Sequence, residues 1–132
     1  MLPFCRDSLA LPYPFIAEEK IEVIPIIQTS KGLSGKNFNY LDGKPELRLL
    51  KVKIPAGIDT PIHTHPSPML IHVTRGRLKH VRGEEINFFK AGDAFVECNK
   101  EGAHYVKNVG KKPATLHVGV VSVVEMPTTI NK

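Results

Sequence analysis

The sequence of 132 residues predicts an all-β protein whose antiparallel strands form a sandwich or a barrel. Short segments rich in branched residues alternate with 11 prolines and 10 glycines, which is the pattern of strands joined by turns. No window of about a dozen residues keeps a 3.6-residue apolar period, so we expect no helix of the kind that joins parallel strands. These two observations favour an antiparallel architecture over an α/β fold.

The expected elements follow in chain order. Residues 1–20, with Pro3, Pro12 and Pro14, are expected to form an arm that wraps the domain or a partner, and residues 32–44 a long loop. Segments bounded by turn residues predict strands at Ile21–Gln28, Leu47–Ile54, Met69–Thr74, Arg77–Val81, Glu85–Phe89, Ala94–Cys98, His104–Lys107 and Thr115–Val124. The expected turns include Leu41–Lys44, Arg82–Glu84 and Lys90–Asp93.

The length of the chain supports one hydrophobic core, because domains usually contain about 100–150 residues. We expect a single domain over residues 21–126, an N-terminal arm at residues 1–20 and a C-terminal tail at residues 127–132. No apolar run approaches the roughly 18 residues that span a bilayer, so no membrane partner is expected. The opening residues lack the pattern of a secretory signal.

The cysteine and charge patterns exclude two further classes of protein. Cys5 and Cys98 form no CxxC pair and no disulfide framework, which indicates a reduced, cytoplasmic protein with Cys98 as a small buried side chain. The formal net charge is +5, but the basic residues are not gathered in one block, and the densest stretch, Arg75–Arg82, is followed after Gly83 by two glutamates. We therefore expect no nucleic-acid partner, and either a solvated basic face or a basic lining that attracts anionic ligands.

The arrangement of the six histidines is the main functional signal. His63 and His65 stand at positions i and i+2, and in an extended strand this spacing puts both imidazoles on one face. His104 is a third candidate ligand at the start of a later strand. Two ligands from one strand and a third from a distant strand leave metal positions open, as in reactive rather than purely structural sites.

Two sequence motifs resemble those of the cupins. Gly57–Gly76 matches the first cupin motif, which reads G, five residues, HxH, three or four residues, E, six residues, G, at every fixed position except the glutamate, which is Met69 here. Gly92–Asn108 is similar to the second motif, although its proline is absent and one extra residue lies between Gly92 and His104. The two motifs occur in the right order and at the right separation, and with the flanking strands the resemblance covers about 100 residues.

The resemblance implies a single-domain cupin, which is an antiparallel jelly-roll barrel, also called a double-stranded β-helix, of six to eight strands around one divalent metal. His63, His65 and His104 would then be the imidazole ligands, and zinc, iron, nickel, copper or manganese would fit them. Met69 is expected to fill space beside the metal; an axial ligand role and loss of the metal are the alternatives. Three neutral imidazoles keep the +2 charge of the ion, which favours an anionic ligand.

The remaining histidines are expected to lie outside the metal site. If Met69 points into the barrel, strand alternation turns His72 to the opposite face as a surface or interface residue, unless a bulge makes it a fourth ligand. His80 lies among basic residues and is expected to be exposed to solvent. His117, in an apolar strand, is expected to be a core histidine, with proton transfer in the pocket as the alternative.

The polar residues around the second motif are expected to have structural or surface positions. Glu97 and Glu101 are interpreted as surface residues, although either could supply a carboxylate near the metal. Asn108 is interpreted as a turn or strand-end residue rather than a ligand. Arg48, Lys51 and Lys53 alternate imperfectly along one strand, and one of them could meet a substrate carboxylate.

Two functional interpretations remain open, because cupins have many activities. In the first, the protein is a metalloenzyme that acts on a small anionic substrate with dioxygenase-like or isomerase-like chemistry. In the second, it is a non-catalytic module that binds or senses a small ligand or a metal. A small-molecule partner is expected in both, and a homodimer is expected because cupins commonly pair their barrels and the arm could be exchanged between copies.

Overall fold

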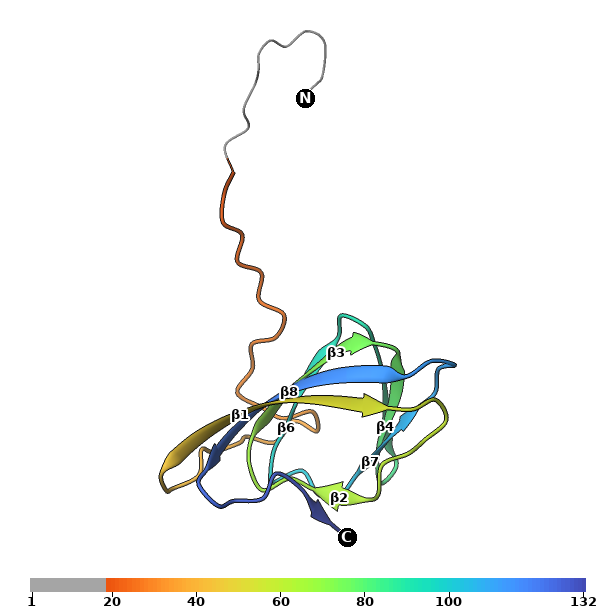
Figure 1. Cartoon of the computed structure of the whole chain (residues 1–132). Coiled ribbons are helices and arrows are strands. Elements are labelled where there is room, and N and C mark those ends of the chain that lie inside the picture. Colours follow the sequence, from red (N-terminus) through yellow and green to blue (C-terminus); the bar gives the residue numbers. More distant parts are fainter. Residues whose placement is uncertain (1–18) are drawn as a thin grey trace, which may run out of the picture.

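A computed structural model describes residues 19–132 of the chain, so residues 1–18 of the predicted arm, with Cys5, lie outside the described residues. The described residues contain no helix and form an antiparallel β barrel (Figure 1). They therefore contain no helix that is long and apolar enough to cross a membrane. The all-β prediction is confirmed.

The barrel is built from three sheets. Their strands are β1 (Pro45–Ile54), β2 (His63–Thr64), β3 (Met69–Arg75), β4 (Arg77–Arg82), β5 (Glu85–Lys90), β6 (Ala94–Glu97), β7 (Tyr105–Asn108), β8 (Ala114–Val123) and β9 (Ile130–Asn131). The large sheet has the order β1-β8-β3-β6, the second has the order β5-β4-β7, and β2 pairs with β9. Every strand predicted after residue 44 is present, with ends that differ by at most two residues.

The strand predicted at Ile21–Gln28 is wrong. This segment leaves the barrel as an extended stretch without strand pairing (Figure 1), and it exposes apolar side chains such as Ile21, which is 95% exposed. Branched residues favour an extended backbone, but a strand also requires a hydrogen-bonding partner, and Pro25 lacks an N–H to offer one.

The predicted homodimer stays a prediction.

Alternation along the large sheet builds the core. In β3 the inward positions are Met69, Ile71 and Val73, which are all buried, as the sequence predicts. In β8 the inward positions from Leu116 to Val120 are likewise buried, and the residues between them face the outside of the sheet. The large sheet therefore has one face toward the barrel interior and one face toward solvent.

The outer face of the large sheet changes character along the strands. Outward positions of β1 and β3 near one end carry Leu47, Leu49 and Leu70, of which Leu49 is 80% exposed. Toward the other end the outward residues of β1 are Lys51 and Lys53, both exposed. The same sheet face thus has an apolar half and a basic half.

Asn108 closes one end of the barrel, as its interpretation as a strand-end residue predicts. Its buried side-chain amide donates hydrogen bonds to the carbonyl oxygens of Ile54 (2.9 Å) and Lys112 (2.8 Å). Its side-chain oxygen accepts a hydrogen bond from the Gly110 N–H at 2.8 Å. One buried amide therefore connects the end of β1 to the turn before β8, and its polar atoms are satisfied.

The C-terminal segment returns to the mouth of the barrel. Within the predicted tail at residues 127–132, β9 pairs with β2, where Ile130 is opposite Thr64 and Asn131 is opposite His63. The Lys132 N–H also donates to the Ile62 carbonyl at 2.8 Å. The first two predicted metal ligands therefore lie next to a strand that the sequence pattern does not predict.

Candidate metal centre

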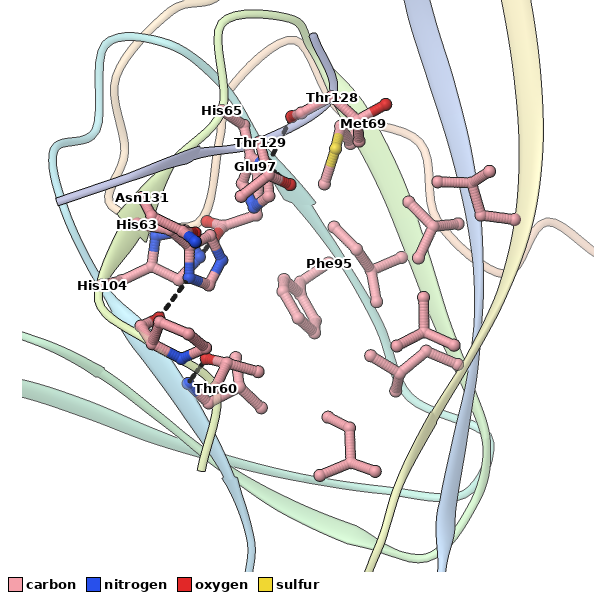
Figure 2. Close-up of a pocket in the computed structure, with 18 residues that line it drawn as sticks. Thr60, His63, His65, Met69, Phe95, Glu97, His104, Thr128, Thr129 and Asn131 are labelled. Carbon is pink, nitrogen blue, oxygen red and sulfur yellow. Dashed lines mark hydrogen bonds and ion pairs between the residues drawn. The ribbon is translucent and has the colours of Figure 1, made fainter. Parts of the chain in front are cut away.

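A cavity of about 270 Å³ occupies the barrel interior and opens beside the three histidines of the two motifs (Figure 2). Its apolar wall consists of Leu50, Val52, Ile54, Ile71, Phe95, Val106, Leu116 and Val118 together with Met69 and Pro61. Its polar lining consists of Thr60, His63, His65, Glu97, His104, Thr128, Thr129 and Asn131. Within residues 19–132, no lysine or arginine lines it. The cavity is therefore an apolar chamber with its polar groups at one end.

The three predicted ligands lie together at this polar end. The ring centroids of His63 and His104 are 4.3 Å apart, those of His63 and His65 are 4.7 Å apart, and those of His65 and His104 are 5.2 Å apart. One ring nitrogen from each lies within 4.8 Å of the others, and all three residues are buried. Reciprocal backbone hydrogen bonds between His63 and His104, of 2.9 and 3.0 Å, hold the two motifs side by side.

Carbonyl oxygens fix the rings of His63 and His65. The Nδ1 atom of His63 lies 2.6 Å from the Pro61 carbonyl oxygen, and that of His65 lies 2.9 Å from the Thr128 carbonyl oxygen. A carbonyl can only accept, so both Nδ1 atoms carry the proton and both Nε2 atoms keep a free lone pair. Histidines that bind metals are commonly oriented by such a second hydrogen bond.

Burial keeps both of these imidazoles neutral. It lowers the pKa of His65 from 6.5 to about 4, and the hydrogen bond to Thr128 offsets only part of this effect. Burial also lowers the pKa of His63 below its ordinary value. Both side chains are therefore unprotonated at neutral pH, which is the form that binds a metal.

These lowered pKa values predict that the metal-free protein loses stability in acid. Between pH 6.5 and 4 the unfolded chain binds protons on His63 and His65 that the folded chain resists, so the free energy of unfolding falls as the pH falls. A pKa lowered from 6.5 to about 4 corresponds to about 3 kcal/mol for His65. Urea unfolding with a chelator present, at pH 7.5 and pH 4.5, measures the loss. The double variant His63→Ala, His65→Ala should show a smaller difference between the two pH values, and an unchanged difference would contradict the assignment.

His104 differs from the other two predicted ligands because both of its ring nitrogens have side-chain partners. Its Nδ1 atom lies 3.2 Å from Nη2 of Arg82, and its Nε2 atom lies 2.7 Å from Oε2 of Glu97. Arginine can only donate, so Nδ1 accepts and the proton of His104 is on Nε2, where it is donated to Glu97. A cation bound to His104 must displace one of these two contacts.

The surface position predicted for Glu97 is wrong, and so is the solvent exposure predicted for His80. Glu97 is 2% exposed and His80 is fully buried. Nε2 of His80 donates to Oε2 of Glu97 at 2.9 Å, and Nη2 of Arg82 donates to Oε1 at 2.8 Å. The ring of His80 also stacks on that of His104, with centroids 4.7 Å apart. Both residues continue the inward alternation of their strands, Glu97 after Phe95 and His80 after Leu78.

These donors keep Glu97 ionised. Burial alone would raise the pKa of this carboxyl group, but the hydrogen bonds from His104 and His80 outweigh it and hold the pKa well below its ordinary value. A buried charge of this kind is tolerated only when it is paired and hydrogen-bonded. A carboxylate therefore lies beside His104 although the first motif lacks its glutamate.

The position of this carboxylate relates directly to the substitution in the first motif. Met69 is buried and lines the cavity, as predicted. In the pairing of β3 with β6, the residue opposite Met69 is Glu97. The carboxylate that the motif lacks at Met69 is thus carried by the neighbouring strand.

The remaining candidates lie away from the cavity. Glu101, predicted on the surface, is buried, and its carboxylate accepts the backbone N–H of Ser34, so it anchors the loop before β1. His72 is half-buried on the outer face, as predicted. The core position predicted for His117 is wrong, because it faces outward between Leu116 and Val118, with Nδ1 3.2 Å from the Thr74 hydroxyl.

The sequence patterns miss the residues that hold the C-terminal segment over the cavity. Nη1 of Arg48 donates to the Thr128 hydroxyl at 2.9 Å, and its Nη2 donates to the Val123 carbonyl at 3.2 Å. The carbonyl of the same Thr128 accepts the hydrogen bond from His65. Arg48 therefore positions His65, one of the predicted ligands, through Thr128. Its partner at residue 128 lies too far along the chain for any local pattern to indicate it.

Comparison with known proteins identifies the family of the chain. The model of the cupin domain family matches residues 50–123, which is more than half of the chain. The chain belongs to the cupin family. The sequence of this cupin matches none of the curated proteins with which it was compared.

Solved structures similar to this cupin show the same fold. They include oxalate decarboxylase from Lactobacillus farciminis in a formate complex (TM-score 0.55, 23% identity, 64% of this chain and 26% of that one). They also include the cupin domain of Schizosaccharomyces pombe Cnp3, with a TM-score of 0.52 and 21% identity over 65% of this chain and 64% of that one. A third is the DMSP lyase DddQ from Ruegeria pomeroyi, with a TM-score of 0.55 and 20% identity over 65% of this chain and 43% of that one. This chain spans less than two thirds of each of these proteins.

Proposed function

We propose that this cupin holds one divalent metal ion with His63, His65 and His104 and acts as an enzyme on a small molecule bound in the barrel cavity. The observation that carries the proposal is the orientation of His63 and His65. Their Nδ1 protons are donated to carbonyl oxygens, so both Nε2 lone pairs are free beside the third histidine. Imidazole nitrogen suits zinc, copper, iron and nickel, and manganese remains compatible.

The charges around the site fit a bound cation. Glu97 is an anion in contact with His104. The site therefore offers a negative charge, as well as neutral imidazoles, to balance the positive charge of the metal. Arg82 neutralises part of this negative charge through its contact with the same carboxylate. When bound, the metal would polarise an oxygen of the substrate or lower the pKa of a water molecule.

The protein side chains would supply orientation and proton handling. His104 holds a proton on Nε2 and shares it with Glu97 at 2.7 Å, beside the cavity. The apolar wall of the cavity would exclude water from a bound substrate, which strengthens electrostatic interactions at its polar end.

The cavity restricts the class of substrate. No cationic side chain of residues 19–132 lines it, so a negatively charged group on the substrate would be neutralised by the metal. The opposite wall is formed by branched aliphatic side chains and Phe95. We therefore propose a substrate with one oxygen-donor head, such as a carboxylate or an enolate, and a compact apolar body that fits about 270 Å³.

A second candidate function is a non-catalytic module that binds or senses such a ligand. One observation favours it: three donors, from His80, His104 and Arg82, already engage the carboxylate of Glu97. A general base needs a lone pair directed at the substrate. If Glu97 keeps these partners, the site binds a ligand without transferring its protons.

Metal analysis tests the proposed function directly. We expect about one divalent ion per chain in protein purified from its native cell, and we expect His65→Ala to lose most of it. His72→Ala is the matched control, because it removes a histidine from the outer face of the same barrel. Equal metal content in the two variants would contradict the ligand assignment.

A turnover assay then separates the two candidate functions. The iron-loaded protein is incubated in air with a panel of branched aliphatic carboxylic acids, and oxygen uptake and product masses are measured. A product whose mass differs from that of the added acid supports an enzyme. An acid recovered unchanged supports the binding module.

A further inference from the structure

We propose a second ligand site, separate from the barrel cavity, that binds a compact polyanion, namely a small molecule carrying two or more phosphate groups. It is a groove of about 770 Å³ on the outer face of the large sheet. The residues that carry the argument are Lys51, Lys53, Arg75, Lys112, Thr115 and His117. Neither the cupin motifs nor the proposed metal centre assigns a ligand role to any of them.

Strand register places these side chains in two rows. Lys53 of β1 is opposite Thr115 of β8, which is opposite Arg75 of β3. In the adjacent row, Lys51 is opposite His117. Paired residues of neighbouring strands lie about 5 Å apart on one face, so both rows present their polar groups to the same hollow. Lys112, in the turn before β8, adds a cation at its end.

The groove carries an uncompensated positive charge. No ion pair within residues 19–132 involves Lys51, Lys53, Arg75 or Lys112. No aspartate or glutamate of the same residues lines the groove either. Four cations around one concave surface repel one another, and a bound anion with several charges would relieve that repulsion. The +5 net charge of the chain is thus concentrated in part on one side of one sheet.

The boundaries of the groove favour a compact ligand over a nucleic acid. The next row of the same face, beyond Lys51, is Leu49, Gly119 and Leu70, which carry no charge. A nucleic-acid strand requires a basic track that follows several successive phosphates. The basic half of this face ends after two rows, and its volume lies in the usual range for small-molecule sites.

The inner side of the same sheet lines the barrel cavity, so the two sites can be tested independently. Leu116 and Val118 of β8 line the cavity, whereas Thr115 and His117 line the groove. Loss of metal binding should leave the groove intact. The double variant His63→Ala, His65→Ala should therefore bind the polyanion as the unaltered protein does.

Calorimetric titration of metal-free protein with tripolyphosphate tests the proposal, with EDTA present because tripolyphosphate binds metals. We expect Lys51→Gln, Lys53→Gln to weaken binding by about tenfold, since it removes two charge-assisted contacts. The matched control is Lys36→Gln, Lys44→Gln, which removes the same charge from exposed lysines that do not line the groove. The control should change the affinity by less than about twofold.

Three results would overturn the proposal. An equal loss of affinity in both double variants would show that the binding of tripolyphosphate depends only on the net charge of the protein. Binding of inorganic phosphate as tightly as tripolyphosphate would exclude a site for several phosphate groups. Tighter binding of a single-stranded oligonucleotide than of tripolyphosphate, at physiological salt, would assign the groove to nucleic acid instead.

Discussion

Replacing Glu97 by alanine is expected to destabilise the protein by about 3–5 kcal/mol, the largest effect that we expect from a single substitution. The carboxylate accepts from His104, His80 and Arg82, and all four side chains are buried or nearly so. Alanine removes the acceptor that these three side chains share and leaves the guanidinium of Arg82, which cannot lose its charge, without its carboxylate partner. Urea unfolding at pH 7.5 measures the change in the free energy of unfolding.

Two controls separate this network from a general effect of removing a glutamate. Glu84→Ala removes an exposed carboxylate and should change stability by less than about 0.5 kcal/mol. Glu97→Gln keeps the shape and one acceptor oxygen but loses the charge. Its loss of stability should therefore lie between those of Glu84→Ala and Glu97→Ala. If the free energy of unfolding of Glu97→Ala lies within about 1 kcal/mol of that of the unaltered protein, the cost of burying the carboxylate is about as large as the stabilisation from its hydrogen-bond partners.

Replacing Gly76 by alanine is expected to cost about 3 kcal/mol of stability, the second largest effect. Gly76 lies between β3 and β4 with φ of 87°, a backbone conformation that disfavours side chains. An added Cβ would also lie 2.8 Å from both Cα and Cβ of Ala114, which is fully buried. The backbone of the neighbouring strand would have to shift, and such overpacking adds to the conformational cost.

Gly83 supplies a matched control for the steric part of this cost. It lies in the next turn, between β4 and β5, with φ of 59°, but an added Cβ would have no atom within 4 Å. Gly83→Ala should therefore show only the conformational cost, about 1 kcal/mol. Thermal or urea unfolding of both variants measures the difference, and equal losses would contradict the contact with Ala114.

Most of the strands and the shared face of His63 and His65 can be predicted from the sequence because both depend on local rules. Alternation and turn residues define strands without knowledge of their partners, so the seven strands predicted after residue 44 lie within two residues of their observed ends, whereas the two-residue strands β2 and β9 are not predicted. The i and i+2 spacing of His63 and His65 is enough to place both rings on one face of an extended strand. Only the motif spacing indicates that His104 joins them.

The errors at His80, Glu97 and His117 share one cause. Each prediction rests on the chemistry of the neighbouring residues or of the side chain itself, whereas strand alternation indicates the opposite face. Alternation with Leu78 and with Phe95 turns His80 and Glu97 inward, and alternation with Leu116 turns His117 outward. Two polar residues are tolerated inside because they pair with each other.

The roles of Thr128 and Arg48 could not be predicted in the same way. The hydrogen bond from His65 to Thr128 joins residues 63 positions apart, and the bond from Arg48 to Thr128 joins residues 80 positions apart. Neither contact has a local pattern, because both depend on the return of β9 to β2. Long-range contacts of this kind form only when the whole barrel is assembled.

The alternation of β8 has a consequence for how this protein could change over generations. Leu116 and Val118 face the cavity, and Thr115 and His117, interleaved with them, face the groove. A point mutation in this strand therefore alters the lining of one compartment without altering that of the other. Natural selection could adjust each ligand preference separately, although a single ten-residue strand encodes a wall of both.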